Sequence, residues 1–335
     1  DKEWGKNITF TTGVSKNLLV NNNFNILGSR KVGFIVSAVL VVIMTVSFVT
    51  RGGNQGIDFS GGRNYVIRFE EPVNTQEIQR MLAPEFEGSS LSVITITSEN
   101  QVRISTNYRI ADNDDAIDQE ILDKLYAGLA EMVDNKGVEA FEAEHVMSVQ
   151  KVGPSIAEDI KTGAMWAVFF SLIAIFLYIL LRFRNVAFSV GALAAVAFTA
   201  FSIIGVYSIS WGWLPFAMEV DQNFIAAILT IIGYQINDTV VVFDRVRENV
   251  GLYPKQDFFT TINKSINSTL GRTVMTSATT LLVLLCIFIL GGDAIRSFVF
   301  AMLLGVIIGT LATIYVASPV AYLTDRRKAK KAAKK

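Results

Sequence analysis

Six long apolar stretches constrain this chain more than any other feature of its sequence. A helix needs about 20 mainly apolar residues to cross the hydrocarbon core of a bilayer. Stretches near that length cover residues 32–49, 164–181, 186–209, 222–243, 273–290 and 297–323. Because 51% of all residues are hydrophobic and gather in these stretches, the composition excludes an ordinary soluble domain. The sequence predicts an all-α membrane bundle of six transmembrane helices.

Residues 50–163, between the first and second stretches, are long enough to form a separate domain. The segment 51–160 is acidic, with 20 acidic and 9 basic side chains. Apolar alternation predicts strands, and helical periodicity, with Asn74 as one N-cap, predicts helices. The expected strands are 64–69, 91–97, 101–105 and 144–152, and the expected helices are 74–82 and 116–132. This strand-helix-strand-strand-helix-strand order predicts an inserted α+β domain of the ferredoxin-like type.

Lysine and arginine residues in the short loops predict the orientation of the bundle. They are concentrated at both ends of the chain and in the loops after the second and fourth stretches. The loop 210–221 has no basic residue, and the loop 291–296 is neutral. The N-terminal segment 1–31 and the basic tail 324–335 are therefore predicted to be cytoplasmic, and residues 50–163 to lie outside the cytoplasm.

Cysteine and histidine are almost absent, since Cys286 and His145 are the only two such residues. A disulfide within the chain is impossible, and neither a structural zinc site nor a histidine-based catalytic site is expected. The sequence predicts no bound metal and no other cofactor.

Asp238 is the only acidic residue inside an apolar stretch. A carboxylate at that depth costs on the order of 2–3 kcal/mol, and binding a proton relieves the cost. A group that charges and discharges as its surroundings change is what a proton-coupled machine requires. The alternative is a structural aspartate that fixes the bundle by pairing with a neighbour. Intramembrane ionisable residues are functional by default, which favours the first interpretation.

Arg272 is the predicted partner of Asp238. It opens the fifth stretch at the same end of the bundle where the fourth stretch closes. A guanidinium stays protonated, so its approach would favour a charged Asp238 and its withdrawal would favour proton uptake. The alternative is an anchor that reaches the lipid headgroups, and the spacing alone does not decide between the two.

Further polar side chains near these residues are candidates for holding water or relaying protons: Tyr234, Gln235, Asn237, Thr239 and Thr276. Interhelical hydrogen bonding is the alternative, and it is favoured for the threonines. In the sixth stretch, Ala301, Gly305 and Gly309 form a small-residue ridge that predicts close packing against a neighbouring helix.

Two glycine-containing runs mark the junctions between the domain and the membrane helices. The first, Gly56-Ile-Asp-Phe-Ser-Gly-Gly62, lacks the lysine and the spacing of a phosphate-binding loop. The second is Val152-Gly-Pro154. The first run is interpreted as a turn, and the second as the junction that leads back into the second apolar stretch. The residues expected to have structural roles in these runs are Gly56, Asp58, Gly61, Gly62, Gly153 and Pro154.

Together these runs resemble the signatures of the SecD and SecF export proteins. The two junction runs are similar to the signatures at either end of the first external domain. Residues 233–249 and 272–277 resemble two signatures that identify SecF, and residues 291–292 and 307–317 match the end of the same pattern. The resemblance covers about residues 26–323. It departs from the family at Gln235, where many members have serine, and at Gly271, where larger residues are common.

The resemblance implies an auxiliary subunit of the bacterial Sec protein translocase, in the resistance-nodulation-division superfamily of proton-driven machines. In that family the aspartate and the arginine of the two SecF signatures are required for proton movement, and they correspond to Asp238 and Arg272. Protons would be the coupling ion, without covalent catalysis, in the bacterial cytoplasmic (inner) membrane.

The resemblance also implies partners. A SecD half or subunit would complete a pseudo-symmetric unit of twelve helices, and residues 1–25 look like the linker of a fused SecD–SecF protein. The other expected partners are the SecY/SecE/SecG channel, the YidC insertase, exported polypeptides and the lipid bilayer. Nucleic acid is not expected.

The resulting hypothesis is that Asp238 takes protons from the outer side and releases them to the cytoplasm. The helix movements would then make the external domains hold and release an exported chain. One alternative is a small-molecule or lipid exporter of the same superfamily, against which the small external domain argues. The other is a proton-independent scaffold or clamp of the translocon, in which Asp238 is structural.

Overall fold

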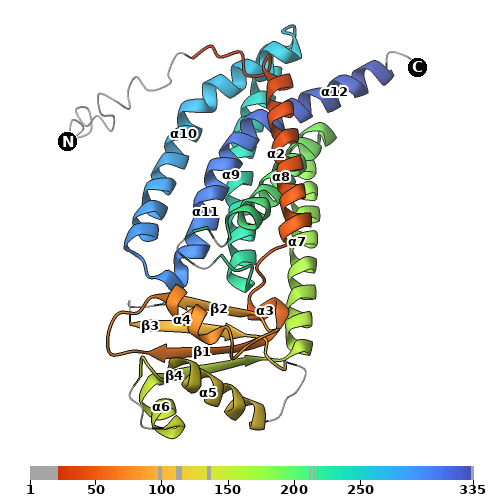
Figure 1. Ribbon diagram of the computed structural model, residues 1–335. Helices are drawn as coiled ribbons and strands as arrows, with labels where there is room; N and C mark the ends of the chain where they lie inside the picture. The colour runs from red at the N-terminus through yellow and green to blue at the C-terminus, as the bar shows by residue number, and fades with distance from the viewer. Residues whose placement is uncertain are drawn as a thin grey trace, which may run out of the picture.

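A helical bundle with a small domain at one end makes up the protein (Figure 1). The computed structural model describes residues 22–96, 100–110, 115–133, 137–211, 213–214, 216 and 218–332. Most of the predicted linker, residues 1–21, and the tail residues 333–335 lie outside the described residues. The described start of the chain and the end of its last helix lie at the end of the bundle opposite to the domain.

Six helices are long and apolar enough to cross a membrane, as the sequence predicts. The first five are α2 (Arg30–Arg51), α7 (Pro154–Phe183), α8 (Val186–Ser210), α9 (Gln222–Leu252) and α10 (Phe258–Leu290). The sixth span covers Ile295–Arg327 and consists of three consecutive segments. These are α11 (Asp293–Ala312), the π-helical turn η1 (Thr313–Ala317) and α12 (Ser318–Ala332).

The π-helical turn η1 is followed by Ser318 and Pro319. Proline has no backbone N–H, so it cannot bond to the carbonyl of Tyr315 one turn earlier. The hydroxyl of Ser318 donates to the carbonyl of Thr313 at 3.2 Å and satisfies one acceptor in the widened turn. Such turns often occur at functional positions of helices.

Several helices are longer than the apolar stretches that predicted them. α7 begins at Pro154, well before Ala164. Proline suits the first helical position, where its missing N–H would have no partner in any case. α9 and α10 continue past the apolar stretches to Leu252 and back to Phe258. The length of an apolar stretch therefore predicts the part of a helix that spans the membrane. The helix itself can continue beyond the stretch, where its polar side chains are packed or solvated.

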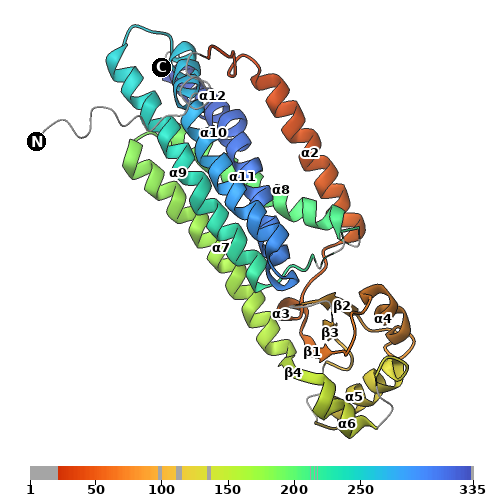
Figure 2. The ribbon, with the colours of Figure 1, turned by 90° about the vertical axis from the view of Figure 1, so that its left-hand side faces the viewer.

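α8 lies at the centre of the bundle and contacts α2, α7, α9, α11 and α12, whereas α2 lies at its outside (Figure 2). The predicted ridge of small residues packs against α9. A Cβ atom at Gly305 would lie 2.2 Å from Ile231, and one at Gly309 would lie 3.4 Å from Gln235. The sixth span and α9 therefore approach closely at the depth of the candidate site.

The domain contains a four-stranded antiparallel sheet with strand order β2-β3-β1-β4. Its elements, in chain order after the short helix α3 (Ile57–Ser60), are β1 (Gly62–Arg68), α4 (Thr75–Leu82), β2 (Leu91–Thr95), β3 (Gln101–Thr106), α5 (Asp115–Leu129), α6 (Val138–His145) and β4 (Val146–Val152). Every predicted strand and helix is present. Asn74 caps α4 as predicted and accepts a hydrogen bond from Gln76 N at 2.9 Å. The short helix α6 was not predicted.

The two faces of the sheet have different roles. One face packs against α4, α5 and α6 through buried side chains such as Ile67 and Ile104. Because successive side chains of a strand point to opposite faces, Ser92 and Arg103 lie on the other face. Both contact Glu219, in the loop before α9. The domain thus contacts the bundle through the face of its sheet that the helices of the domain do not cover.

Candidate functional site

Asp238 is buried within the bundle, with 6% of its surface exposed. Its Oδ2 atom has no hydrogen-bond partner among the described residues. An ionised carboxylate without a partner is costly in such a place, so a carboxyl group there gains from binding a proton. The structure therefore places the candidate proton carrier where its charge state matters.

Arg272 lies near Asp238 but is not locked to it. The side chain of Arg272 is exposed on α10. In the described chain it forms no ion pair with Asp238. A positive charge near a carboxyl group favours its ionised form. Because the two side chains form no ion pair in the described chain, the charge of Asp238 can change, whereas a closed ion pair would hold Asp238 in its charged form.

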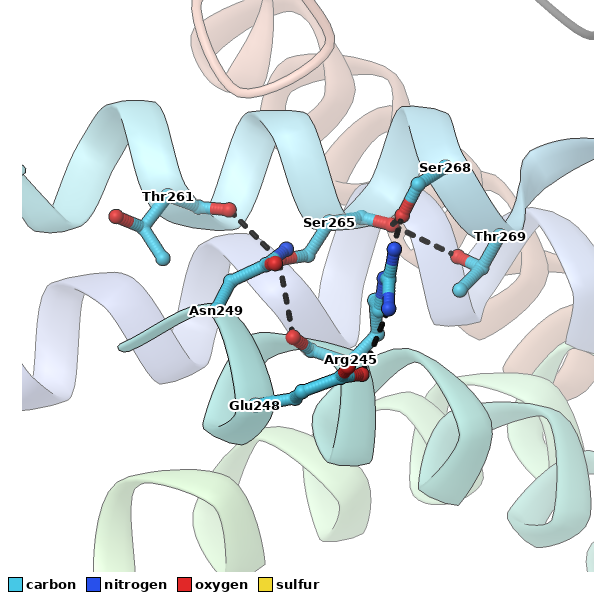
Figure 3. Close-up of polar contacts among 7 residues, drawn as sticks. All are labelled: Arg245, Glu248, Asn249, Thr261, Ser265, Ser268 and Thr269. Atoms are coloured by element: carbon cyan, nitrogen blue, oxygen red, sulfur yellow. Dashed lines mark hydrogen bonds and ion pairs between the residues drawn. The ribbon is translucent and has the colours of Figure 1, made fainter. Parts of the chain in front are cut away.

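A cluster of polar contacts fixes α9 against α10 on the side of the site away from the domain (Figure 3). Asn249 donates to the Ser265 hydroxyl at 2.8 Å, and the Nε of Arg245 donates to Ser268 at 3.3 Å. Asp238 is two turns of α9 from Arg245, and Arg272 is one turn of α10 from Ser268. These contacts therefore fix α9 against α10 two turns from Asp238 and one turn from Arg272.

Paired hydroxyl groups connect the three helices around the site. Thr239 and Thr313 are 3.0 Å apart and join α9 to η1. Ser277 and Thr310 are 2.7 Å apart and join α10 to α11. Tyr234 and Thr280 are 3.2 Å apart and join α9 to α10. Thr239, Thr310 and Thr280 each donate their one hydroxyl hydrogen to a backbone carbonyl of their own helix. In each pair the other hydroxyl group is therefore the donor.

Gln235 and Thr273 add buried polar atoms that are not bonded within the described chain. Gln235 is 1% exposed and Thr273 is 2% exposed, and neither the amide group of Gln235 nor the hydroxyl of Thr273 has a partner. Buried polar groups are normally hydrogen-bonded. Gln235 lies about one turn of α9 before Asp238, whereas Thr273 lies on α10, directly after Arg272.

The predicted site residues are thus divided between two faces. Tyr234, Gln235 and Thr239 face neighbouring helices, as described above. Asn237 is exposed. Thr276 is also exposed, and its hydroxyl donates to the carbonyls of Arg272 and Thr273 at 3.1 and 3.0 Å. These two residues lie on the outer surface of the described chain rather than beside Asp238.

Sequence reasoning did not identify Thr310 and Thr313 as site residues. Both belong to the sixth span and approach α9 and α10 only through tertiary packing. The available signal was their position one turn apart, next to Gly309 of the small-residue ridge. In the described part of the chain, no group of three or more His, Cys, Asp or Glu side chains is placed to hold a metal ion.

The first junction run forms a tight turn from α3 into β1. Gly61 and Gly62 have φ angles of 71° and 149°, which strongly favour glycine. A Cβ atom at Gly61 would lie 2.2 Å from Ile110, and one at Gly62 would lie 2.6 Å from the Thr106 carbonyl. The run 56–62 thus comprises the short helix α3 and the turn that leads into β1.

The second junction run connects β4 to α7. Pro154 is the first residue of α7. Gly153 has an ordinary φ of −70° and open space around it, so nothing in the described chain explains this glycine.

Comparison with known proteins identifies the family of the chain. A family model for the C-terminal part of the SecD/SecF protein-export membrane proteins matches residues 133–327. A second model, for the SecD/SecF GG motif, matches residues 46–73. The chain belongs to the SecD/SecF family. Protein translocase subunit SecF of Rhodothermus marinus is 39% identical to it over 90% of this chain and 92% of that one. For SecF of Haemophilus influenzae the identity is 34%, over 88% and 83%.

Solved structures extend the match to the fold. The crystal structure of SecDF from Thermus thermophilus, described as a translocon-associated membrane protein, superposes with a TM-score of 0.75 at 31% identity. The match covers 92% of this chain and 39% of that chain. As a SecD/SecF family member, the chain is an auxiliary subunit of the Sec protein translocase and a multi-pass inner-membrane protein.

Proposed function

We propose that this family member uses the proton-motive force, together with a SecD half, to promote export of polypeptides across the cytoplasmic membrane. The observation that carries the proposal is the environment of Asp238. Its carboxyl group is buried, one of its oxygens is unpartnered in the described chain, and Arg272 is close without forming an ion pair. Protons are the coupling ion in this proposal, and no cofactor or covalent step is involved.

Protonation of Asp238 would bias two arrangements of α9 relative to α10 and the sixth span. When Asp238 is charged, it attracts Arg272. When it is neutral, the attraction is lost and the two helices can separate slightly. A membrane potential of 100 mV is worth about 2.3 kcal/mol per charge moved, which biases a two-state equilibrium about fifty-fold. That bias suffices to rectify the movement of an exported chain.

An exposed stripe of small and polar residues on α9 supports a membrane-embedded partner. Ala226, Thr230, Gly233 and Asn237 follow one another at helical spacing and are all exposed. A Cβ atom at Gly233 would meet nothing within 4 Å. Small residues favour close approach of helices, and an amide such as that of Asn237 is costly in lipid. We assign this face to the SecD half.

Other partners are proposed on the basis of the family. The Thermus thermophilus relative is named SecDF, and 40% of its length matches this chain. The SecY/SecE/SecG channel, the YidC insertase and the exported polypeptide are the further partners proposed for this chain.

The domain is proposed to be ferredoxin-like and to lie outside the cytoplasm. Its strand order β2-β3-β1-β4, with two strands joined by the α4 crossover and β3 between them, supports this fold. The distribution of lysine and arginine supports cytoplasmic ends for the chain.

The experiment is Asp238→Asn in the full chain, assembled with its SecD partner and the translocon in vesicles. Potential-dependent export of a secreted reporter and proton flux are both measured. We expect the variant to assemble normally and to lose both activities, because an asparagine amide does not take up a proton near neutral pH. Asp244→Asn, on the same helix but in a solvent-exposed ion pair with Arg182, is the matched control and keeps both activities.

The opposite result has a clear meaning. If Asp238→Asn exports as well as the unmodified protein under a membrane potential, the carboxyl group is structural. The chain is then a proton-independent scaffold or clamp.

A further inference from the structure

The loop that leads into α9 is fastened to the segment between α2 and the domain by backbone hydrogen bonds. Val220 N donates to the Asn54 carbonyl at 2.7 Å, and Gly56 N donates to the Val220 carbonyl at 3.1 Å. Gln55 and Val220 form a parallel bridge. A short piece of sheet therefore joins two segments that are far apart in the sequence.

Glu219 fastens the same loop to the sheet of the domain. Its Oε1 accepts a hydrogen bond from the Ser92 hydroxyl at 2.9 Å, and its Oε2 lies 3.9 Å from Arg103. The Glu219 side chain is only 11% exposed. Ser92 belongs to β2 and Arg103 to β3, so one carboxylate contacts two neighbouring strands. A contact with a rigid sheet is more restrictive than one with a flexible loop.

Asp58, from the first junction run, reaches the beginning of α9. Its Oδ2 accepts a hydrogen bond from Gln222 N at 3.2 Å. Asp221, the N-cap of α9, accepts one from Phe224 N at 2.8 Å. The first backbone N–H groups of a helix have no partner within it and carry partial positive charge. Two carboxylates, one from each side of the interface, therefore hold the start of α9.

The packing at this place is tight. A Cβ atom at Gly56 would lie 3.2 Å from the Cβ of Asp221, so the two segments touch. Burial raises the pKa of Asp221, and the neighbouring Asp58 acts in the same direction. Two like charges are kept together here, which requires that the surrounding contacts hold them in place.

We infer that residues 54–58 and 219–222 form a joint that transmits movement of α9 to the external domain, with Asp58 and Glu219 as its positioning residues. This inference rests on the proposed function. Asp238 lies 16 residues after Gln222 in one unbroken helix, about 24 Å along its axis. A shift of α9 at the depth of Asp238 therefore reaches the joint without a flexible linker between them.

The domain has a second rigid attachment, which converts such a shift into rotation. β4 ends at Val152 and α7 begins at Pro154, so only Gly153 separates sheet and helix. α3 also contacts α7. When α9 slides relative to α7, a body held at both points must turn.

Paired substitutions in the full chain, assembled with its SecD partner and the translocon in vesicles, test the joint. Asp58→Ala and Glu219→Ala remove the acceptors, whereas Asp58→Asn and Glu219→Gln keep one acceptor oxygen. We expect the alanine variants to keep proton flux and to lower potential-driven export about tenfold, the effect of losing one charge-assisted hydrogen bond. The amide variants recover most of the export. Glu87→Gln, an exposed acid of the same domain, is the matched control.

A crosslink provides a second test. Ser92→Cys and Glu219→Cys are combined in a Cys286→Ala background. With both thiols free the protein is expected to be uncoupled, and a short bifunctional thiol reagent is expected to restore export. If the crosslinked protein instead stalls, the contact must open during each cycle and the inference is wrong.

The outcomes separate this inference from the proposed function. Proton flux that is intact in Asp58→Ala, with export lost, supports both. Export that stays normal in Asp58→Ala and Glu219→Ala overturns the joint alone. Proton flux that does not depend on Asp238 overturns the proposed function, whatever the joint variants do.

Discussion

At the scale of single residues, the site combines a fixed frame with a centre that has free bonding capacity. The hydroxyl pairs Thr239–Thr313 and Ser277–Thr310 hold the three helices together. Inside this frame, Asp238 and Gln235 have buried polar atoms without partners in the described chain. If every polar atom around Asp238 were hydrogen-bonded, a change in its charge would be resisted. Without the hydroxyl pairs between the helices, lipid could enter the site. The arrangement allows the charge of one carboxyl group to change while the helices stay packed.

Asp221 offers a residue-scale prediction about pH. Because burial raises its pKa in the folded protein, its ionised form costs stability when the pH is above that raised pKa. The cost disappears as the pH falls below the unfolded value, about 3.9. Asp221→Asn, which keeps an oxygen for Phe224 N, should raise the unfolding temperature at pH 7. The gain should shrink towards pH 4, as measured by thermal unfolding of the full chain in detergent. A gain that is equal at both pH values would show that burial of the charge is not the cause.

The two ionisable site residues could be predicted from sequence, but their surroundings could not. Asp238 stands alone in an apolar stretch and Arg272 borders the next one, which singles them out as candidates, although spacing alone left the role of Arg272 open. Gln235 and Asn237 are two residues apart, yet one is buried beside Gly309 and the other is exposed. Which face of α9 meets the sixth span depends on packing between distant segments. Thr313 was not identified from sequence for the same reason, because it contacts Thr239 only through packing of distant segments in the folded chain.

At the scale of elements, close packing of α9 against the sixth span determines the geometry of the site. Gly305 and Gly309 let the two helices approach until side chains of α9 lie over the glycine backbone. The π-helical turn η1 follows directly and presents Thr313 to Thr239. A larger residue on this ridge would push the helix pair apart and separate the two hydroxyl groups.

Gly305→Ala tests this packing. The added Cβ would lie 2.2 Å from Ile231, so the helices must shift, and overpacking of this kind typically costs about 1–3 kcal/mol. We expect a lower unfolding temperature in detergent and reduced proton flux. Gly163→Ala, in α7, where a Cβ meets nothing within 4 Å, should change neither. Unchanged stability of Gly305→Ala would mean that the ridge is looser than the structure indicates.

Elements were predictable from sequence where one physical signal dominated. Apolar length identified all six membrane helices, and period-two alternation identified the strands. The short helix α6 escaped because eight residues with mixed polarity give no clear period. The early start of α7 escaped because its first two turns are polar and outside the apolar stretch. α6 is stabilised by packing within the domain, where Phe141 is part of the core, and α7 contacts α3 of the domain.

At the scale of the whole molecule, the bundle and the domain act as two bodies joined at a few points. α7 continues directly from the sheet, and the loop before α9 is held by Glu219 and Asp58. A proton that moves through the bundle is useful for export only if the domain lies on the side where the exported chain emerges. The orientation of the chain in the membrane is therefore part of the mechanism.

Cysteine labelling tests that orientation, and the sequence makes the experiment simple because Cys286 is the only native cysteine. In a Cys286→Ala background, Glu87→Cys places a thiol on the domain and Lys255→Cys places one between α9 and α10, both at exposed positions. A membrane-impermeant maleimide should label Glu87→Cys in intact spheroplasts and Lys255→Cys only after permeabilisation. Arginine and lysine near the short loops retain those loops in the cytoplasm, which is the physical reason for this expectation. The reverse pattern would put Arg272 at the outer end of the apolar stretch 273–290. Protons entering from outside would then meet the fixed positive charge before Asp238, and proton-driven export by this route would be excluded.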